Sequence, residues 1–240
     1  MRSFLLGAER EGAFNIPFKV ERGGGVPTAR GYVQDGLVAL WDGKENAGWG
    51  VHDATATDWV DLTGGGRNWA NIVTGSNSWG ADHLSVYQNT RRNQTWTIGT
   101  AVNTIEVCGW SEASDSFLLF SLGGTDEDSN KLFSILPTNN RGFQFLSRSP
   151  SMFKPHNADW TASATWGDAA NPDHTYYNGE EMPHTAGSTS WGSMSVAAFT
   201  PNASYSFRGK VRSIRVYDRA LTAAEVAANY AVDKARFNIS

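Results

Sequence analysis

Short runs of hydrophobic residues alternate with polar residues along most of the chain, and clusters of Gly, Asn, Asp, Ser and Pro separate the runs. Runs of this length that are rich in β-branched and aromatic residues predict β-strands. We expect strands over residues 37–41, 82–86, 95–97, 104–110, 117–122, 131–136, 142–146, 160–166, 174–177, 190–199 and 206–217. Many short strands with almost no helical pattern predict an all-β fold, a two-sheet antiparallel jelly-roll sandwich.

The pattern changes near the end of the chain, where residues recur at helical spacing. Thr222 and Glu225 form a capping box, in which each side chain accepts a hydrogen bond from a backbone N–H that the first helical turn leaves unpaired. Val226 and Tyr230 follow on one helix face. We therefore expect a short C-terminal helix that attaches the end of the chain to the sandwich through these two side chains.

The strand before this helix is unusually basic. Lys210 and Arg212 would share one strand face by alternation, yet Ile214 and Val216 have the same parity. This conflict predicts either a bulge or a change in what covers the strand near Ser213. Basic side chains on a strand usually face water, so we expect a solvated outer face. The basic cluster comprises Arg208, Lys210, Arg212, Arg215 and Arg219.

A tight hairpin is predicted at Asn178-Gly179. A two-residue type I′ turn needs positive φ at both central positions, and Asn followed by Gly is the sequence that adopts it most readily. The flanking residues, TYY before the turn and Glu180 after it, fit two short strands.

Three segments together resemble a known family. They are the closing strand and helix (207–237), the opening GLVALWDGKENAGWGVHDATATDWVD (36–61) and the hairpin TYYNGEEM (175–182). The chain resembles laminin-G-like domains of the concanavalin A-like lectin and glucanase jelly-roll superfamily, in the variants found in bacteria and their phages. These motifs are structural, so the resemblance implies a fold more directly than an activity.

Composition agrees with a single loop-rich sandwich. The chain has 240 residues with 12% aromatic residues, ten tryptophans and 25 glycines, and this length suits one large β domain. Residues 1–35, with a glycine run and two prolines, are expected to form an N-terminal arm or attachment segment, and residues 36–240 the sandwich domain. The arm is either an unstructured leader or a tie to a larger protein assembly.

Charge and apolar patterning limit the partners. A formal net charge of −4 offers no electrostatic footprint for nucleic acid. No segment approaches the ~20 apolar residues of a membrane span, so membrane insertion is not expected. The first residues are not expected to be a signal peptide, because Glu9 and Glu11 interrupt their short apolar stretch. We expect a virion or extracellular location, since a particle component leaves the cell by assembly and lysis.

Catalytic signatures are missing from the sequence. A glycosidase of this superfamily would carry Glu-x-Asp-x-Glu on one strand to set two carboxylates about 5–5.5 Å apart, and the chain has no such run. The five histidines lack zinc-site spacing, and no Gly-x-Ser-x-Gly motif or phosphate-binding loop occurs. We therefore expect that the chain is not an enzyme and that Cys108 is a small buried hydrophobe.

Calcium is the one cofactor that the sequence raises. Asp126, Asp128 and Asn130 begin like a calcium loop, because alternating oxygen ligands suit a hard cation. The run departs from the EF-hand pattern at Lys131 and Pro137. These three residues are candidate metal ligands, and no cofactor other than Ca²⁺ is expected.

Tryptophans are the candidate ligand-binding residues, since the apolar face of a sugar ring stacks on an exposed indole. Trp41 and Trp110 lie in apolar strands and are expected in the core. The four that precede glycine or end a strand are the candidate ligand contacts: Trp49, Trp79, Trp166 and Trp191.

The sequence therefore favours a non-catalytic recognition or structural module that binds carbohydrate or a cell surface, on a phage or prophage particle as a tail or capsid decoration. The alternative is a carbohydrate-active enzyme, a glycoside hydrolase, or its accessory carbohydrate-binding domain. A third possibility is a structural decoration without any ligand, which predicts that the loop tryptophans are buried.

Overall fold

The structure is a computed structural model, and it describes residues 31–73, 75, 77–86, 92–95, 103–112, 121–122, 133–135, 143–145, 158–165, 174–182, 196–199 and 209–239. The predicted arm (1–35) lies outside the described residues except for its last part, Gly31 to Asp35.

The described residues form thirteen strands, one 3-10 turn and one α-helix. The 3-10 turn η1 spans Gly43–Glu45 and the helix α1 spans Ala223–Phe237. The strands are β1 (Leu37–Asp42), β2 (Ser78–Trp79), β3 (Leu84–Val86), β4 (Arg92–Thr95), β5 (Thr104–Ser111), β6 (Ser121–Leu122), β7 (Phe133–Ile135), β8 (Phe143–Phe145), β9 (Ala158–Thr165), β10 (His174–Tyr177), β11 (Glu180–Met182), β12 (Val196–Phe199) and β13 (Gly209–Tyr217).

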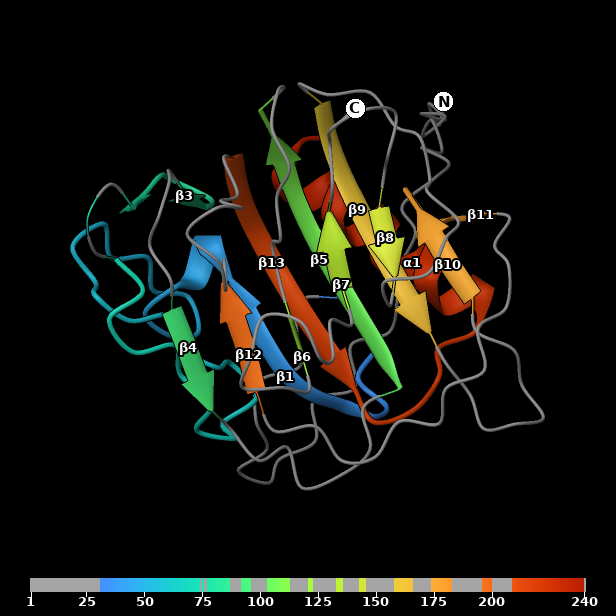
Figure 1. Cartoon of the computed structure of the whole chain (residues 1–240), viewed down its shortest axis with the longest axis horizontal. Coiled ribbons are helices and arrows are strands. Elements are labelled where there is room, and N and C mark those ends of the chain that lie inside the picture. Colours follow the sequence, from blue (N-terminus) through green and yellow to red (C-terminus); the bar gives the residue numbers. More distant parts are fainter. Residues whose placement is uncertain are drawn as a thin grey trace, which may run out of the picture.

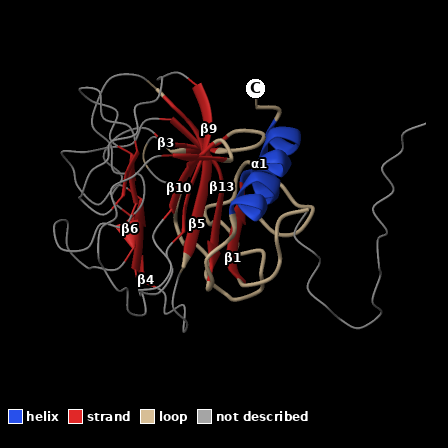
Figure 2. Ribbon diagram, turned by 90° about the vertical axis from the view of Figure 1, so that its right-hand side faces the viewer, coloured by secondary structure: helices blue, strands red, loops and turns tan. Residues whose placement is uncertain are grey.

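An eight-stranded antiparallel sheet dominates the molecule (Figure 1). Its order is β11-β10-β9-β5-β13-β3-β2. One edge of β13 pairs with β3 at its start (209–211) and with β1 along the rest (213–217). Three strands, β4-β12-β6, form a second sheet, and β7 pairs with β8. Figure 2 shows the layers: α1 covers one face of the large sheet, while β4 and β6 lie on its other side.

The all-β prediction is confirmed, and each predicted strand overlaps an observed one. Of the two alternatives predicted near Ser213, the bulge is present, because the register of β13 with β5 shifts between Val211 and Ser213. The Asn178-Gly179 hairpin joins β10 to β11 with φ values of 52° and 78°. The Thr222–Glu225 capping box starts α1 as expected.

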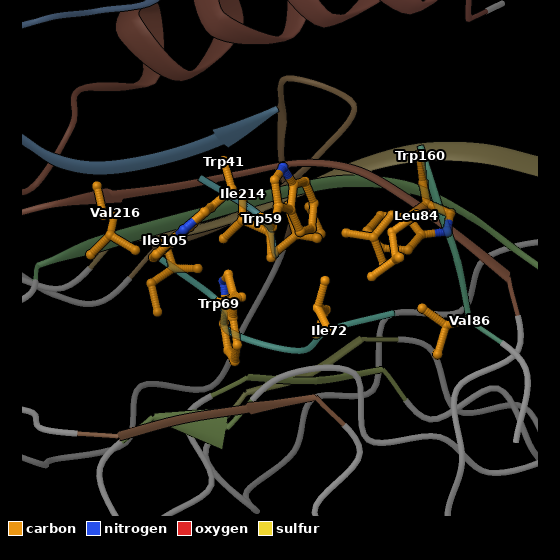
Figure 3. Packing of buried hydrophobic residues seen from close by; sticks show 14 of the residues in the cluster. Trp41, Trp59, Trp69, Ile72, Leu84, Val86, Ile105, Trp160, Ile214 and Val216 are labelled. Atoms are coloured by element: carbon orange, nitrogen blue, oxygen red, sulfur yellow. The ribbon is translucent and has the colours of Figure 1, made fainter. Parts of the chain in front are cut away.

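The core between the two sheets is built largely from tryptophan (Figure 3). Trp41 and Trp69 pack with ring centroids 5.7 Å apart, and Trp59 meets Trp79 edge-on at 5.3 Å. Trp59 and Trp69 also exchange backbone hydrogen bonds, and the Leu62 N–H donates to the Leu40 carbonyl, which attaches this loop to β1. The predicted core position of Trp41 is confirmed, since it is fully buried.

The other face of the large sheet packs against α1 through a buried ionic network. Arg215 of β13 donates to Glu106 of β5 at 2.8 Å and makes two bonds of 2.7 Å to Asp233 of α1. All three side chains are fully buried. The prediction of a solvated basic face is therefore wrong for Arg215, and also for Arg212, because both guanidinium groups find carboxylate partners under the helix or beside it.

The end of the predicted arm joins this network. Tyr32 donates its hydroxyl hydrogen bond to Asp233 at 2.7 Å, and the Val33 N–H donates to Asn229 at 2.8 Å. The Arg215 guanidinium lies 4.2 Å from the centroid of the Tyr32 ring. Residues 31–35 therefore pack as part of the sandwich, on its helical side.

Candidate functional site

A row of side chains crosses five neighbouring strands of the large sheet on the face that carries α1. We call it the outer-face row, and it consists of Asp159 (β9), Trp110 (β5), Lys210 (β13), Ser85 (β3) and Ser78 (β2). Each of these residues is the direct cross-strand partner of the next. A straight row of this kind presents its side chains to one surface, because residues in register point to the same side of a sheet.

The row lies beyond the area that α1 covers. Cys108 of β5 is fully buried against Phe237 and Ile239 at the end of the helix. Trp110 is two positions further along the same strand, so it points to the same side as Cys108. It is only partly buried, and Asp159 and Lys210 beside it are partly exposed as well. The row therefore forms a partly open surface next to the end of α1.

Trp110 and Lys210 form the centre of this surface. The Lys210 ammonium lies 5.5 Å from the centroid of the Trp110 ring, within the range of a cation–π interaction. The prediction that Trp110 belongs to the core is wrong. β5 is buried on both faces along most of its length, so its apolar sequence does not reveal that the last outward residue lies past the end of the helix.

Arg212, the extra residue of the β13 bulge, holds two acidic side chains, one in the row and one beside it. Its Nη1 donates to Asp159 Oδ1, and its Nε lies 3.5 Å from Asp82 Oδ2. The bulge turns Arg212 to the outer side together with its neighbour Ser213, which alternation alone does not allow. Two carboxylates are thus fixed on either side of β13.

A histidine bridges Asp82 and the row. His83 Nδ1 lies 2.6 Å from Asp82 Oδ1, and His83 Nε2 lies 3.1 Å from the Ser85 hydroxyl. The hydrogen bond from His83, together with the charge of Arg212, holds the pKa of Asp82 below its usual range. Asp82 is therefore an ionised carboxylate that orients the imidazole.

Two glycines allow the backbone around His83 to pack closely. A Cβ on Gly80 would lie 2.3 Å from His83 Cε1, and a Cβ on Gly43 would lie 2.5 Å from the Asp82 carbonyl oxygen. Any larger residue at either place would displace the loop. The imidazole is consequently fixed between Gly80, Asp82 and Ser85.

The four predicted ligand tryptophans have different surroundings. Trp79 is buried in the tryptophan core with its indole N–H donating to the Ala56 carbonyl at 2.8 Å, so it presents no free ring face. Trp49 is half-buried against Leu40 and Leu62. It stays a candidate, whereas Trp166 and Trp191 lie outside the described residues.

The metal candidates Asp126, Asp128 and Asn130 also lie outside the described residues. Within the part of the chain that the structure describes, no group of three or more His, Cys, Asp or Glu side chains is arranged to hold a metal ion. Calcium binding stays a prediction. No helix among the described residues is long and apolar enough to cross a membrane.

Sequence reasoning missed the outer-face row and His83. Asp82-His83-Leu84-Ser85 matches no motif, and its one usable signal is alternation, which places His83 and Ser85 on the same side of a strand and Leu84 on the other. The pairing of Ser85 with Lys210 and of Lys210 with Trp110 joins segments far apart in the sequence.

Comparisons with solved structures show a shared fold, whereas comparisons of the sequence find no match. No protein-family model and no curated protein sequence matches the chain. Trypanosoma rangeli sialidase in complex with sialic acid has a TM-score of 0.60 at 15% identity, and the match covers 83% of this chain and 33% of the sialidase. The chain thus spans about a third of the sialidase's length.

Two further solved structures share the fold. Domain 4 of AbnA, a GH43 extracellular arabinanase from Geobacillus stearothermophilus in complex with arabinotriose, has a TM-score of 0.59 at 14% identity, covering 82% of this chain and all of that domain. The botulinum neurotoxin type G receptor binding domain has a TM-score of 0.55 at 12% identity, covering 83% and 52%. Identities this low show a common fold alone.

These matches correct one prediction. The expectation that the chain is not an enzyme is contradicted, because several of the matched structures are sialidases and the fold therefore occurs within enzymes. The sequence lacks the paired-carboxylate run of that superfamily's glycosidases, and this absence does not separate the chain from enzymes as a class.

Proposed function

We propose that this chain is a carbohydrate-binding β-sandwich of the concanavalin A-like, laminin-G-like type, and that the outer-face row is its sugar-binding surface. The observation that carries the proposal is Trp110, a partly exposed indole on a rigid central strand with polar side chains on both sides. The shared fold with the arabinanase domain and the sialidases supports a carbohydrate-related role.

The chemistry of the row suits a sugar. The apolar face of a pyranose or furanose ring stacks on an indole, and the hydroxyls around its rim need donors and acceptors. Asp159 accepts hydrogen bonds on one side of Trp110, and the Lys210 ammonium donates them on the other. Lys210 also offers a cation to a sugar carboxylate, because no described carboxylate pairs with it.

Binding is tested with a glycan array, followed by calorimetry with the best glycan and with arabinotriose and sialic acid. Trp110→Ala is expected to weaken binding at least tenfold, about 1.4 kcal/mol. Trp49→Ala, which removes the other described candidate tryptophan, is the matched control and is expected to leave affinity within about twofold. Loss of binding in Trp49→Ala with full binding in Trp110→Ala contradicts the assignment.

The place of the domain in a larger particle stays a separate prediction. A location on a phage or prophage virion rests on the sequence resemblance and on the N-terminal segment. Co-sedimentation of the chain with purified phage particles from an induced lysogen would support that location, and its absence from such particles would contradict it.

A further inference from the structure

We propose that Ser85, His83 and Asp82 form a nucleophilic serine site that hydrolyses small acyl esters. The three side chains have the connectivity that such chemistry needs. The nucleophile lies within hydrogen-bonding reach of a base, and an acid orients the base from its far side. The distances are 3.1 Å from Ser85 Oγ to His83 Nε2 and 2.6 Å from His83 Nδ1 to Asp82 Oδ1.

The carboxylate fixes which nitrogen carries the proton. Asp82 accepts from Nδ1, so the proton of a neutral His83 lies on Nδ1 and Nε2 is free to accept from the Ser85 hydroxyl. Arg212 lies 3.5 Å from the other oxygen of Asp82, which keeps the carboxylate charged and in place. Asp82 is thus a positioning residue, whereas His83 is the general base.

The site is rigid and reachable only by a small group. Gly80 and Gly43 fix the loop that carries His83, and Ser85 is anchored by pairing with strands on both sides. Ser85 exposes 9% of its surface and the His83 side chain 14%. An acetyl-sized carbonyl group fits this limited access better than a long acyl chain.

The reaction balances without an added cofactor. Ser85 Oγ attacks the ester carbonyl carbon while its proton passes to His83 Nε2, and the carbonyl π electrons move to oxygen. The tetrahedral intermediate then collapses, breaking the bond to the alcohol oxygen, which takes the proton back from His83. Water attacks the acyl-serine in the same way, releasing the carboxylic acid and restoring Ser85.

The position of the site in the outer-face row indicates which kind of molecule would bear the acyl ester. Trp110 lies two strands from Ser85, a separation of about 10 Å at the usual strand spacing. A sugar stacked on Trp110 would extend an O-acyl substituent toward Ser85. This choice of an acylated sugar rests on the proposed function, whereas the esterase chemistry does not.

The test uses the full chain and two probes that contain no sugar. Methanesulfonyl fluoride, a serine reagent close to acetyl in size, is expected to form an adduct that mass spectrometry locates on Ser85, and p-nitrophenyl acetate is expected to be hydrolysed. Ser85→Ala abolishes both, and His83→Gln lowers both rates by about 10²–10⁴-fold. Asp82→Asn lowers kcat with KM unchanged, which a purely structural residue would not do.

Thr55→Ala is the matched control, because Thr55 is an exposed residue outside the row whose hydroxyl donates to a carboxylate, Asp53 Oδ1, at 2.7 Å. It is expected to leave labelling and hydrolysis unchanged, and thermal melting verifies that every variant is folded. No adduct on Ser85 of the folded wild-type chain, or equal labelling in His83→Gln, overturns the site. Labelling of Ser85 in a chain that binds no glycan supports the serine site and contradicts only the choice of an acylated sugar as its substrate.

Discussion

The buried network beneath α1 gives the sharpest stability prediction, and the perturbation is Arg215→Met. Arg215 makes three hydrogen bonds to Glu106 and Asp233, and none of the three side chains is exposed to water. Methionine keeps a long apolar side chain and removes the cation. The carboxylates of Glu106 and Asp233 are then left buried without their shared partner. Burial raises the pKa of Glu106, which means that it disfavours the charged form of this side chain.

The expected loss follows from that geometry. Breaking a buried ion pair by removing one partner costs about 3–5 kcal/mol, because the remaining charge stays desolvated. A loss of this size is a large part of the ~5–15 kcal/mol that stabilises a typical domain. For a chain of this length it corresponds to a fall in Tm of roughly 6–20 °C. Adding Glu106→Gln and Asp233→Asn should recover part of the loss, since both unpaired charges are then removed.

The assay is urea unfolding followed by tryptophan fluorescence, with circular dichroism as a second probe. Arg219→Met is the matched control, because Arg219 makes the same kind of ion pairs with Asp35 and Glu225 in a partly exposed setting. Exposed pairs contribute about 0–1 kcal/mol. If Arg215→Met destabilises the chain no more than Arg219→Met does, the reasoning about the buried network is wrong.

Three further predictions concern α1 and its surroundings. Hydrogen bonds from Arg219 and Thr222 lower the pKa of Glu225 to about 2 from 4.5, so its stabilisation is full above pH 4.5 and is lost as the pH falls toward 2. In Glu225→Gln, the free energy of unfolding measured with urea should fall less between pH 7 and pH 3 than in the wild type, by about 1 kcal/mol or less. An unchanged pH profile would contradict this. Gly179→Ala should cost about 1–2 kcal/mol in the same assay, because φ is +78° and the new Cβ would lie 2.9 Å from Tyr230; a neutral effect would show that the hairpin adjusts freely. Burial raises the pKa of the Cys108 thiol, so Ellman's reagent should modify it only as the protein unfolds, and rapid modification of the folded protein would count against its buried position.

Local signals in the sequence predicted the local structure well. The capping box, the Asn178-Gly179 turn and the strand segments are each decided by neighbouring residues, so spacing and composition were enough. The bulge near Ser213 was one of two alternatives predicted for the same reason, because the basic and apolar residues of one strand conflicted in parity.

Tertiary context decided what the sequence could not. Arg212 and Arg215 were predicted to lie on the surface because their carboxylate partners are distant in the sequence. The partner of Arg212 is Asp159, and the partners of Arg215 are Glu106 and Asp233. Trp110 was predicted to lie in the core because the sequence does not show where α1 ends relative to β5. In the structure the helix ends over Cys108 and leaves Trp110 partly uncovered.

The central claim is that a sugar binds on Trp110, and nuclear magnetic resonance of the indole N–H groups tests it most directly. The ten tryptophans give separate indole signals, which single Trp→Phe variants assign. On titration with the best glycan from the array, we predict that the Trp110 indole signal shifts most and that the Trp49 signal stays in place. A shift confined to Trp49, Trp166 or Trp191 with Trp110 unmoved would contradict the account.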